Sequence, residues 1–212
     1  SPTIAGLRMY QGEVIGEAKG RAISVLRAER IALNFLQRMS GIATETARYV
    51  AALGDSTTRI IDTRKTLPGY RELDKYAVRC GGGANHRFNL AGGVMLKDNH
   101  IAAARGSIIE AVRMVRAQAP MMLKVEVEVT DFDELAEALE ANADVIMLDN
   151  MSTEMMAEAV RRVRDEKPHI AVEASGNITL ERLPELADIG LDYISSGALT
   201  HSVVAADISL KF

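Results

Sequence analysis

Residues 123–150 read LKVEVEVTDFDELAEALEANADVIMLDN, and this stretch decides the fold class. Apolar runs at 123–129 and 144–149 flank a segment in which Asp131 and Glu134 have the spacing of a helix-capping box. The stretch therefore predicts a strand, a helix and a second strand. This is the repeating unit of a parallel sheet covered by helices.

The same alternation extends in both directions. Further short apolar runs occur at 59–62, 94–97, 169–174 and 192–195, with helical stretches between most of them. Toward the N-terminus we expect a helix over 25–39, a break at Ser40-Gly41 and a second helical run to Ala52. Residues 1–22 are expected to form short strands and turns.

Polar residues follow nearly every predicted strand, and no glycine-rich dinucleotide fingerprint follows the first one. Both observations favour a barrel, which gathers its strand ends at one mouth, over a doubly wound sheet. Six clear strands are few for an eight-stranded barrel. We therefore expect an α/β fold that is an irregular or partly open parallel barrel of six to seven strands.

Bulk properties restrict the class of protein. With 212 residues, 48% of them hydrophobic, the chain can bury one core. A single cysteine, Cys80, excludes an intrachain disulfide framework and a Cys-rich zinc site, and favours the cytoplasm. The net charge of -4 and the lack of an apolar run near ~20 residues give no indication of nucleic acid or a membrane as a partner.

The strand at 123–129 is predicted to be functional. Lys124, Glu126 and Glu128 alternate with valines and so share one face. Burying carboxylates without partners costs several kcal/mol, so they should face a cation, a metal ion or a wet ligand cavity. The alternative is the solvated face of an edge strand. Asp149 ends the next strand at the same mouth.

A set of cations should face these acids. Its members follow the first strand (Arg64, Lys65), lie in a glycine-rich loop (His86, Arg87) or follow the second strand (Lys97). Arginine binds carboxylates and phosphates with a planar pair of donors. The set fits a ligand with several negative groups, such as a dicarboxylate together with a phosphorylated sugar. The alternative is a group of solvated surface cations.

The last two predicted strands end in SGNIT (175–179) and SSGALTHS (195–202). Small residues between a strand and a helix expose backbone N–H groups that bind phosphate, and barrels often use their final two loops in this way. Plain tight connections are the alternative interpretation.

The segment DTRKTLPGYRELDKYAVRCGGGANHRFNLAGGVMLKDNHI (62–101) resembles the quinolinate phosphoribosyltransferase family along its whole length. AERIALNFLQRMSGIAT (28–44) precedes it, and VEVEV, LDN, EASGNI and ISSGALTHS follow in the family's order. The resemblance implies transfer of the phosphoribosyl group of 5-phosphoribosyl 1-diphosphate to quinolinate with Mg²⁺. The products are nicotinate mononucleotide, pyrophosphate and CO₂, as part of NAD biosynthesis.

The resemblance also implies the site residues. The two quinolinate carboxylates are expected at Arg64, Lys65, His86, Arg87 and Lys97, and the magnesium and sugar side at Glu126 and Asp149. Phosphate groups are expected at Ser175, Gly176, Asn177, Ser196 and Gly197, with His201 beside them. Lys65, Glu126 and Asp149 are the expected catalytic residues. Arg30 is expected to reach the site of a second subunit, which implies a homodimer.

Finally, the resemblance implies a domain division. Residues 1–24 are expected to be a remnant of the family's N-terminal α/β domain, most of which would be missing, and 25–212 the catalytic barrel. Two alternatives to the main function remain. One is a related enzyme, either nicotinate phosphoribosyltransferase or a molybdenum-transport-associated paralogue. The other is a truncated barrel without turnover.

Overall fold

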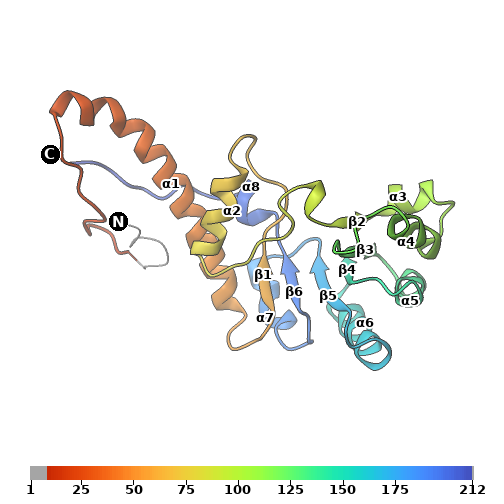
Figure 1. Cartoon of the computed structure of the whole chain (residues 1–212). Helices are drawn as coiled ribbons and strands as arrows, with labels where there is room; N and C mark the ends of the chain where they lie inside the picture. The colour runs from red at the N-terminus through yellow and green to blue at the C-terminus, as the bar shows by residue number, and fades with distance from the viewer. Residues whose placement is uncertain (1–8, 212) are drawn as a thin grey trace.

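The structure is a computed structural model that describes residues 9–211. Over these residues helices and strands alternate (Figure 1). The strands are β1 (Arg59–Ile61), β2 (Val94–Leu96), β3 (Val125–Val129), β4 (Val145–Asp149), β5 (Ala171–Ser175) and β6 (Tyr193–Ser195). The α-helices are α1 (Ala22–Ala52), α2 (Arg71–Cys80), α3 (Asp98–Ala103), α4 (Ile108–Arg116), α5 (Phe132–Glu140), α6 (Thr153–Glu166), α7 (Leu183–Leu186) and α8 (Ala198–His201). Two 3₁₀ turns, η1 (Leu90–Gly92) and η2 (Leu180–Arg182), complete the elements.

All six strands are parallel and form one sheet in the order β1-β6-β5-β4-β3-β2. In Figure 1 the arrows of β1, β6 and β5 point the same way. The sheet stays open between β1 and β2, where only a single parallel bridge, from Ile61 to Ala84, extends the free edge of β1. The prediction of a partly open parallel α/β barrel is confirmed, with six strands.

β3 is an inner strand, paired with β2 on one side and with β4 on the other. Val125 and Val127 are buried in the core, and Glu126 between them is only 6% exposed. Lys124 lies before the strand and is exposed. The alternative of a solvated edge strand is therefore wrong, and the β3 carboxylates face the interior.

Side-chain caps begin several of the helices. Asp131 accepts hydrogen bonds from the backbone N–H groups of Asp133 and Glu134, each 2.9 Å long, at the start of α5. Ser107 accepts one of 3.3 Å from Glu110 at the start of α4. Each such cap stabilises its helix by about 1 kcal/mol and fixes where the preceding loop ends.

α1 is continuous, so the predicted break at Ser40-Gly41 is wrong. Gly41 is buried in the middle of the helix, and a Cβ on it would lie 2.2 Å from the carbonyl oxygen of Val204. The C-terminal segment runs back along α1 (Figure 1), and the N–H of Ala206 donates to the carbonyl of Gln37 over 2.9 Å. The glycine therefore admits a crossing chain and does not end the helix.

The part of the chain before α1 holds no strand in the described region. Residues 9–20 form a turn and irregular chain, so the strands predicted for the first segment are wrong for this part, and residues 1–8 lie outside the described residues. α1 itself projects past the sheet (Figure 1). Among residues 9–211, no helix combines the length and the apolar content needed to cross a membrane.

Candidate active site

The carboxyl ends of the parallel strands meet at one edge of the sheet, as the sequence predicted. Lys97 follows β2, Asp149 ends β4, Ser175 ends β5, and Ser196 follows β6. The segment 84–88 joins this edge beside β1 through the bridge of Ala84. The polar residues predicted from six strand ends therefore share one mouth.

Two buried carboxylates and one imidazole lie inside this mouth. His86 Nε2 is 3.0 Å from Glu126 Oε2 and 3.6 Å from Glu173 Oε2. The backbone N–H of Arg87 donates to His86 Nδ1 over 2.7 Å. Because Nδ1 accepts, the ring proton is assigned to Nε2, which donates to Glu126.

The second oxygen of each carboxylate, Oε1 of Glu126 and of Glu173, is buried without a hydrogen-bond partner among the described residues. Burial and the neighbouring charge of Glu126 raise the pKa of Glu173 well above its usual range. Unpartnered buried carboxylates are costly in an ordinary core. The pair therefore marks a place where a polar or cationic ligand would be stabilised.

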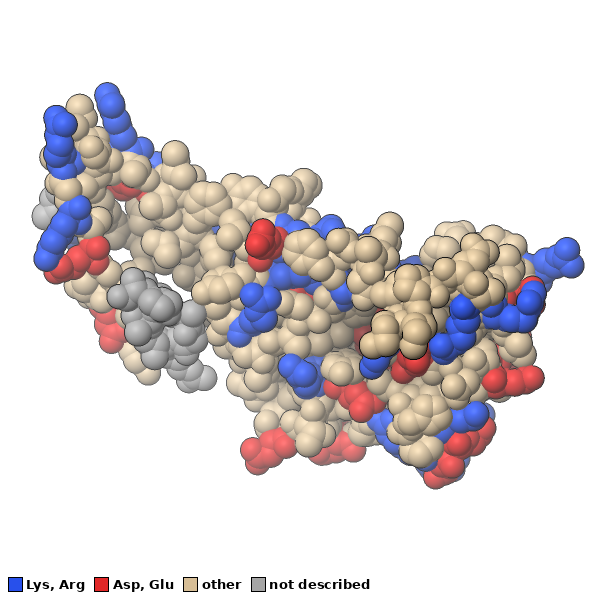
Figure 2. Space-filling view, viewed as in Figure 1, with Lys and Arg blue, Asp and Glu red and all other residues tan. Residues whose placement is uncertain are grey.

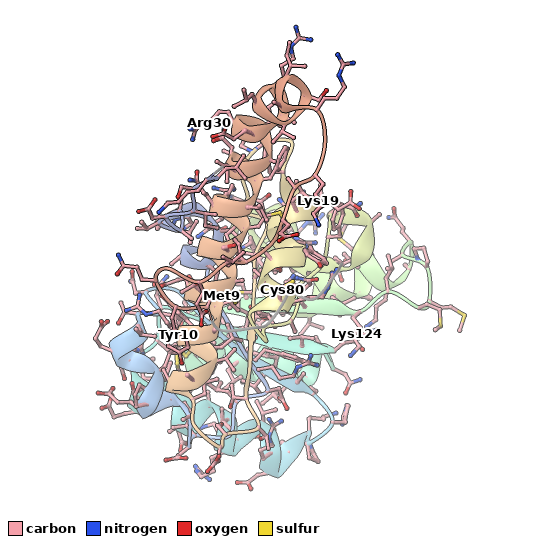
Figure 3. All side chains as sticks on the ribbon, turned by 90° about the vertical axis from the view of Figure 1, so that its left-hand side faces the viewer. Met9, Tyr10, Lys19, Arg30, Cys80 and Lys124 are labelled. Atoms are coloured by element: carbon pink, nitrogen blue, oxygen red, sulfur yellow. The ribbon has the colours of Figure 1, made fainter. Side chains whose placement is uncertain are left out.

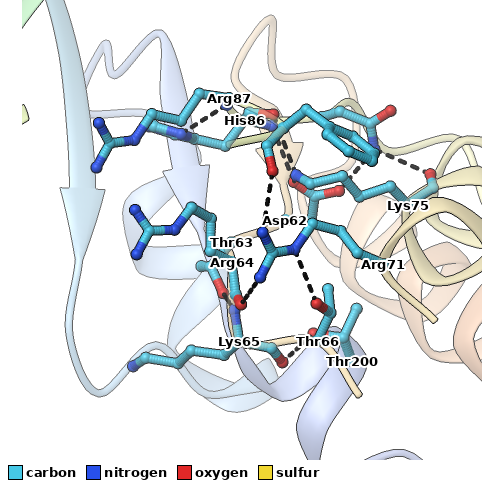
Figure 4. A network of polar contacts seen from close by, with 12 residues as sticks. Asp62, Thr63, Arg64, Lys65, Thr66, Arg71, Lys75, His86, Arg87 and Thr200 are labelled. Atoms are coloured by element: carbon cyan, nitrogen blue, oxygen red, sulfur yellow. Dashed lines mark hydrogen bonds and ion pairs between the residues drawn. The ribbon is translucent and has the colours of Figure 1, made fainter. Parts of the chain in front are cut away.

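The predicted cations lie around these acids. Arg64, Lys65 and Arg87 extend to the same side, away from Lys75 and α2 (Figure 4). Arg87 Nη1 donates to the carbonyl of Gly93 over 2.7 Å. Burial lowers the pKa of Arg87, and the charge of Arg64 lowers it further, so the two guanidinium groups repel each other.

These three cations differ from the cations on α6. Arg161 on α6 is paired with Glu158 and Asp165, and Figure 2 shows acidic and basic groups interspersed over this part of the surface. Within residues 9–211, Arg64, Lys65 and Arg87 form no ion pair. Such a cluster of like charges without acidic partners favours an anionic ligand over the interpretation as solvated surface cations. Lys97 is different, because it pairs with Glu128 of β3.

The loop after β5 is shaped by a required glycine. Gly176 has φ +80°, and a Cβ there would lie 2.3 Å from Asn150 Oδ1. Asn177 follows with φ +48° and donates to the same Asn150 oxygen over 3.0 Å. Asn150 in turn donates to Asp149 Oδ2 over 2.7 Å. The predicted phosphate residue Asn177 is therefore joined to Asp149 by hydrogen bonds through Asn150, and Gly176 lies against the same Asn150 side chain.

The loop after β6 meets the loop that carries Lys65. A Cβ on Gly197 would lie 2.7 Å from Lys65 Cδ and 2.9 Å from His201 Cδ2. Thr200 donates its hydroxyl to the carbonyl of Lys65 over 2.9 Å. Lys65, Gly197 and His201, which were predicted separately, are thus brought together.

Comparison with known proteins agrees with this arrangement. The model of the quinolinate phosphoribosyl transferase C-terminal domain matches residues 42–211, and that of the N-terminal domain matches residues 5–40. The chain is 51% identical over 206 residues to a probable nicotinate-nucleotide pyrophosphorylase (carboxylating) of Bacillus subtilis, covering 97% of this chain and 70% of that protein. The chain belongs to the quinolinate phosphoribosyl transferase family.

Further members of the family show the same likeness. The human nicotinate-nucleotide pyrophosphorylase (carboxylating) is 44% identical over 199 residues, which cover 93% of this chain and 67% of the human one. The crystal structure of NadC from Streptococcus pyogenes superposes with a TM-score of 0.86 at 49% identity. That match covers 91% of this chain and 66% of the NadC chain, so this chain spans about two thirds of its relatives. The division predicted at residue 24 stays a prediction.

Arg30 stands apart from the other residues that the family resemblance implies. It is exposed on the part of α1 that projects past the sheet (Figure 3). It therefore does not join the mouth of its own chain, and its predicted role in a second subunit stays a prediction.

The two carboxylates expected to serve magnesium lie at different depths. Glu126 is in register with Val145, so Asp149 is four residues further along β4, roughly 13 Å nearer the mouth. One ion cannot bind both directly at ~2.1 Å. Asp149 lies beside the glycine loop and offers the hard oxygen ligand that Mg²⁺ prefers. Asp149 therefore fits an ion that also carries substrate phosphates, whereas Glu126 faces the deeper part of the site.

Glu173, which completes the acidic cluster, was not among the residues predicted from the sequence. Its signal was available, because Glu173 interrupts an apolar run just as Glu126 does in β3. Asp62 and Lys75 were not predicted either, and they form a buried ion pair beneath the His86 loop. No pattern in the sequence pairs these two, because their contact depends on how α2 packs against the end of β1.

Proposed function

We propose that this chain carries the phosphoribosyl-transfer site for quinolinate, with 5-phosphoribosyl 1-diphosphate as donor and Mg²⁺ as cofactor, in the synthesis of NAD. The observation that carries the proposal is a group of three cations at the strand ends beside glycine loops, Arg64, Lys65 and Arg87, which form no ion pair among the described residues. The names of the relatives, which describe a carboxylating nicotinate-nucleotide pyrophosphorylase, support the same substrate pair. A cytoplasmic location, expected from the single cysteine, is part of the same proposal.

In the proposed reaction the quinolinate ring nitrogen attacks C1′ of the ribose and the bond from C1′ to the diphosphate oxygen breaks. Positive charge develops on the ribose, and the carboxylate of Glu126 lies deep enough to stabilise it. Magnesium would be held by Asp149 and would neutralise the departing diphosphate. The backbone of the loops at Gly176 and Gly197 would bind its phosphate oxygens.

The second step would release CO₂ from C2 of the ring. The bond between C2 and the carboxylate breaks, its electron pair is stabilised by the adjacent cationic ring nitrogen, and C2 then takes a proton. Arg64, Lys65 and Arg87 would hold both carboxylates until the ring is in place, so positioning supplies much of the rate. No residue is required to act as a nucleophile.

Calorimetric binding of quinolinate tests the proposal. The wild-type chain should bind quinolinate more tightly than nicotinate, because only the dicarboxylate engages the whole cluster. Arg87→Met should weaken quinolinate binding by about 10-fold or more, since a hydrogen-bonded ion pair is lost. The control is Arg161→Met on α6, which removes a cation that already has acidic partners. Equal binding of quinolinate and nicotinate would contradict the proposal.

We further propose that the chain functions as a homodimer with shared sites. Large apolar side chains are exposed along α1, namely Ile23, Leu26, Ile31, Phe35 and Leu36. An apolar stripe of this kind is typical of a protein–protein interface, and Arg30 lies on the same helix. Mixing Arg30→Ala chains with Lys65→Ala chains should restore part of the activity that each variant lacks alone. No rescue in mixed dimers would contradict shared sites.

A further inference from the structure

Arg71, the first residue of α2, bridges the two loops that carry the cation cluster (Figure 4). Its Nε donates to Thr66 Oγ1 over 3.1 Å, and its Nη2 donates to the carbonyl of Arg64 over 3.3 Å, both in the loop after β1. Its Nη1 donates to the carbonyl of Phe88 over 3.3 Å, in the loop of His86 and Arg87. One planar side chain therefore binds both loops at their backbones.

The two loops need such a link because their side chains repel each other. The charge of Arg64 lowers the pKa of Arg87, which means that the two guanidinium groups are close enough to interact. Arg71 adds a third positive charge, yet it forms no ion pair within residues 9–211 and donates to neutral acceptors only. No carboxylate offsets the repulsion that this charge adds. Three hydrogen bonds that span the gap between the loops offset it instead.

A second link lies one helical turn further along α2. Lys75 is four residues from Arg71 and so lies on the same helix face. It is 2% exposed, pairs with Asp62 and also donates to the carbonyl of His86 over 3.1 Å. Asp62 accepts from the N–H of His86 over 2.9 Å. This buried pair fixes one end of the His86 loop, while Arg71 fixes its far end against the loop of Arg64.

We propose that Arg71 is a positioning residue that sets the spacing between Arg64 and Arg87, and thereby the preference for two adjacent carboxylates over one. The inference rests on the proposed function, because the ligand it discriminates is quinolinate. Arg71 acts through the loops and does not touch the ligand. A monocarboxylate needs only one loop, so its affinity depends little on the spacing, whereas a dicarboxylate must engage both loops together.

The test measures three dissociation constants in the full chain, those of quinolinate, nicotinate and inorganic pyrophosphate. Arg71→Met should weaken quinolinate binding by roughly 10-fold or more, while the affinities for nicotinate and pyrophosphate change by less than about 3-fold. Thr66→Val removes only one of the three bonds and should give a smaller change in the same direction. Circular dichroism checks that each variant is folded.

Two comparisons show whether Arg71 acts by setting the spacing of the loops, by its positive charge or by direct contact with the ligand. Arg71→Lys keeps the charge but cannot reach three acceptors with a planar fork, so its quinolinate affinity should stay close to that of Arg71→Met. Full rescue by lysine would show that charge alone matters and would overturn the inference. In an Arg87→Met background, Arg71→Met should have little further effect. Effects that simply multiply would indicate direct ligand contact and would also overturn it.

The role proposed for Arg71 can be wrong even if the proposed function is correct. If the wild-type chain prefers quinolinate and Arg71→Met keeps the same ratio of quinolinate to nicotinate affinity, only the role of Arg71 is wrong. If the wild-type chain does not bind quinolinate, both the proposed function and the inference are wrong.

Discussion

His86 and Glu126 are 40 residues apart in the sequence, and the imidazole Nε2 lies 3.0 Å from the carboxylate oxygen Oε2. His86 belongs to the segment beside β1, at one edge of the open sheet, whereas Glu126 is on β3, next to the other edge strand. The contact therefore spans the side on which the barrel is open. Among residues 9–211 no seventh strand closes this side, and the contact joins the segment beside β1 to β3 through side chains.

Glu173→Gln should flatten the pH dependence of stability. Burial and Glu126 raise the pKa of Glu173 well above the usual 4.5. The folded chain keeps this proton at pH values where the unfolded chain has lost it, so the free energy of unfolding should fall as the pH rises from 4.5 through the raised pKa. Thermal unfolding across about pH 4 to 8, with chelator present, measures the slope. An unchanged slope in Glu173→Gln, with Glu140→Gln on α5 as the control, would contradict this.

Lys75→Met should destabilise the fold by about 3–5 kcal/mol, because it leaves Asp62 charged and buried without its partner. The double variant Asp62→Leu with Lys75→Met removes both charges and should lose less than the sum of the two single changes. Urea unfolding gives the three free energies. Additive losses would mean that the two residues are not coupled as a pair.

Gly176→Ala should abolish binding of ribosyl diphosphate while leaving the fold intact. The new Cβ would collide with Asn150, which ties the loop to Asp149. Gly106→Ala is the matched control, since Gly106 has nearly the same positive φ of +79° but nothing within 4 Å of the added Cβ. Backbone strain should cost each variant about 1–2 kcal/mol of stability, the contact with Asn150 should cost Gly176→Ala somewhat more, and only Gly176→Ala should lose binding, as measured by calorimetry. Equal affinity in the two variants would refute the role of the loop.

Gly41→Ala should destabilise the fold, although replacing glycine by alanine inside a helix usually stabilises a protein. Alanine inside a helix normally stabilises it by roughly 0.5–1 kcal/mol relative to glycine. Here the added Cβ would lie 2.2 Å from the carbonyl of Val204, so the C-terminal segment must move away from α1. Chemical denaturation should show a loss of stability, and limited proteolysis should cut residues 203–211 faster. A gain in stability would show that the crossing of the two segments is not tight.

The fold was predictable because each strand-to-helix unit is marked by residues that are close together in the sequence. The apolar runs, the cap at Asp131 and the glycine loop at Gly176 depend on neighbours in the sequence. The predictions that failed concern features that depend on contacts between distant segments of the chain. Gly41 looks like a helix breaker until the crossing segment at Val204 is known.

The same distinction applies to the site. The ends of parallel strands converge by topology alone, so the grouping of Lys65 with Gly197 and His201 follows from correct strand assignment. The different depths of Glu126 and Asp149 require the strand register, which the sequence does not contain. The pairing of Asp62 with Lys75 requires the packing of α2, which is a tertiary contact between two charged residues thirteen positions apart.

Turnover of quinolinate that carries ¹⁴C in the carboxylate at C2, with ribosyl diphosphate and Mg²⁺, tests the proposed reaction itself. The wild-type chain should release labelled CO₂ and form nicotinate mononucleotide, and both should depend on ribosyl diphosphate and be lost in Arg87→Met. Formation of the nucleotide from nicotinate but not from quinolinate would contradict the account and indicate a sister enzyme. Tight binding of quinolinate with no labelled CO₂ would equally contradict it and indicate a barrel that binds without turnover.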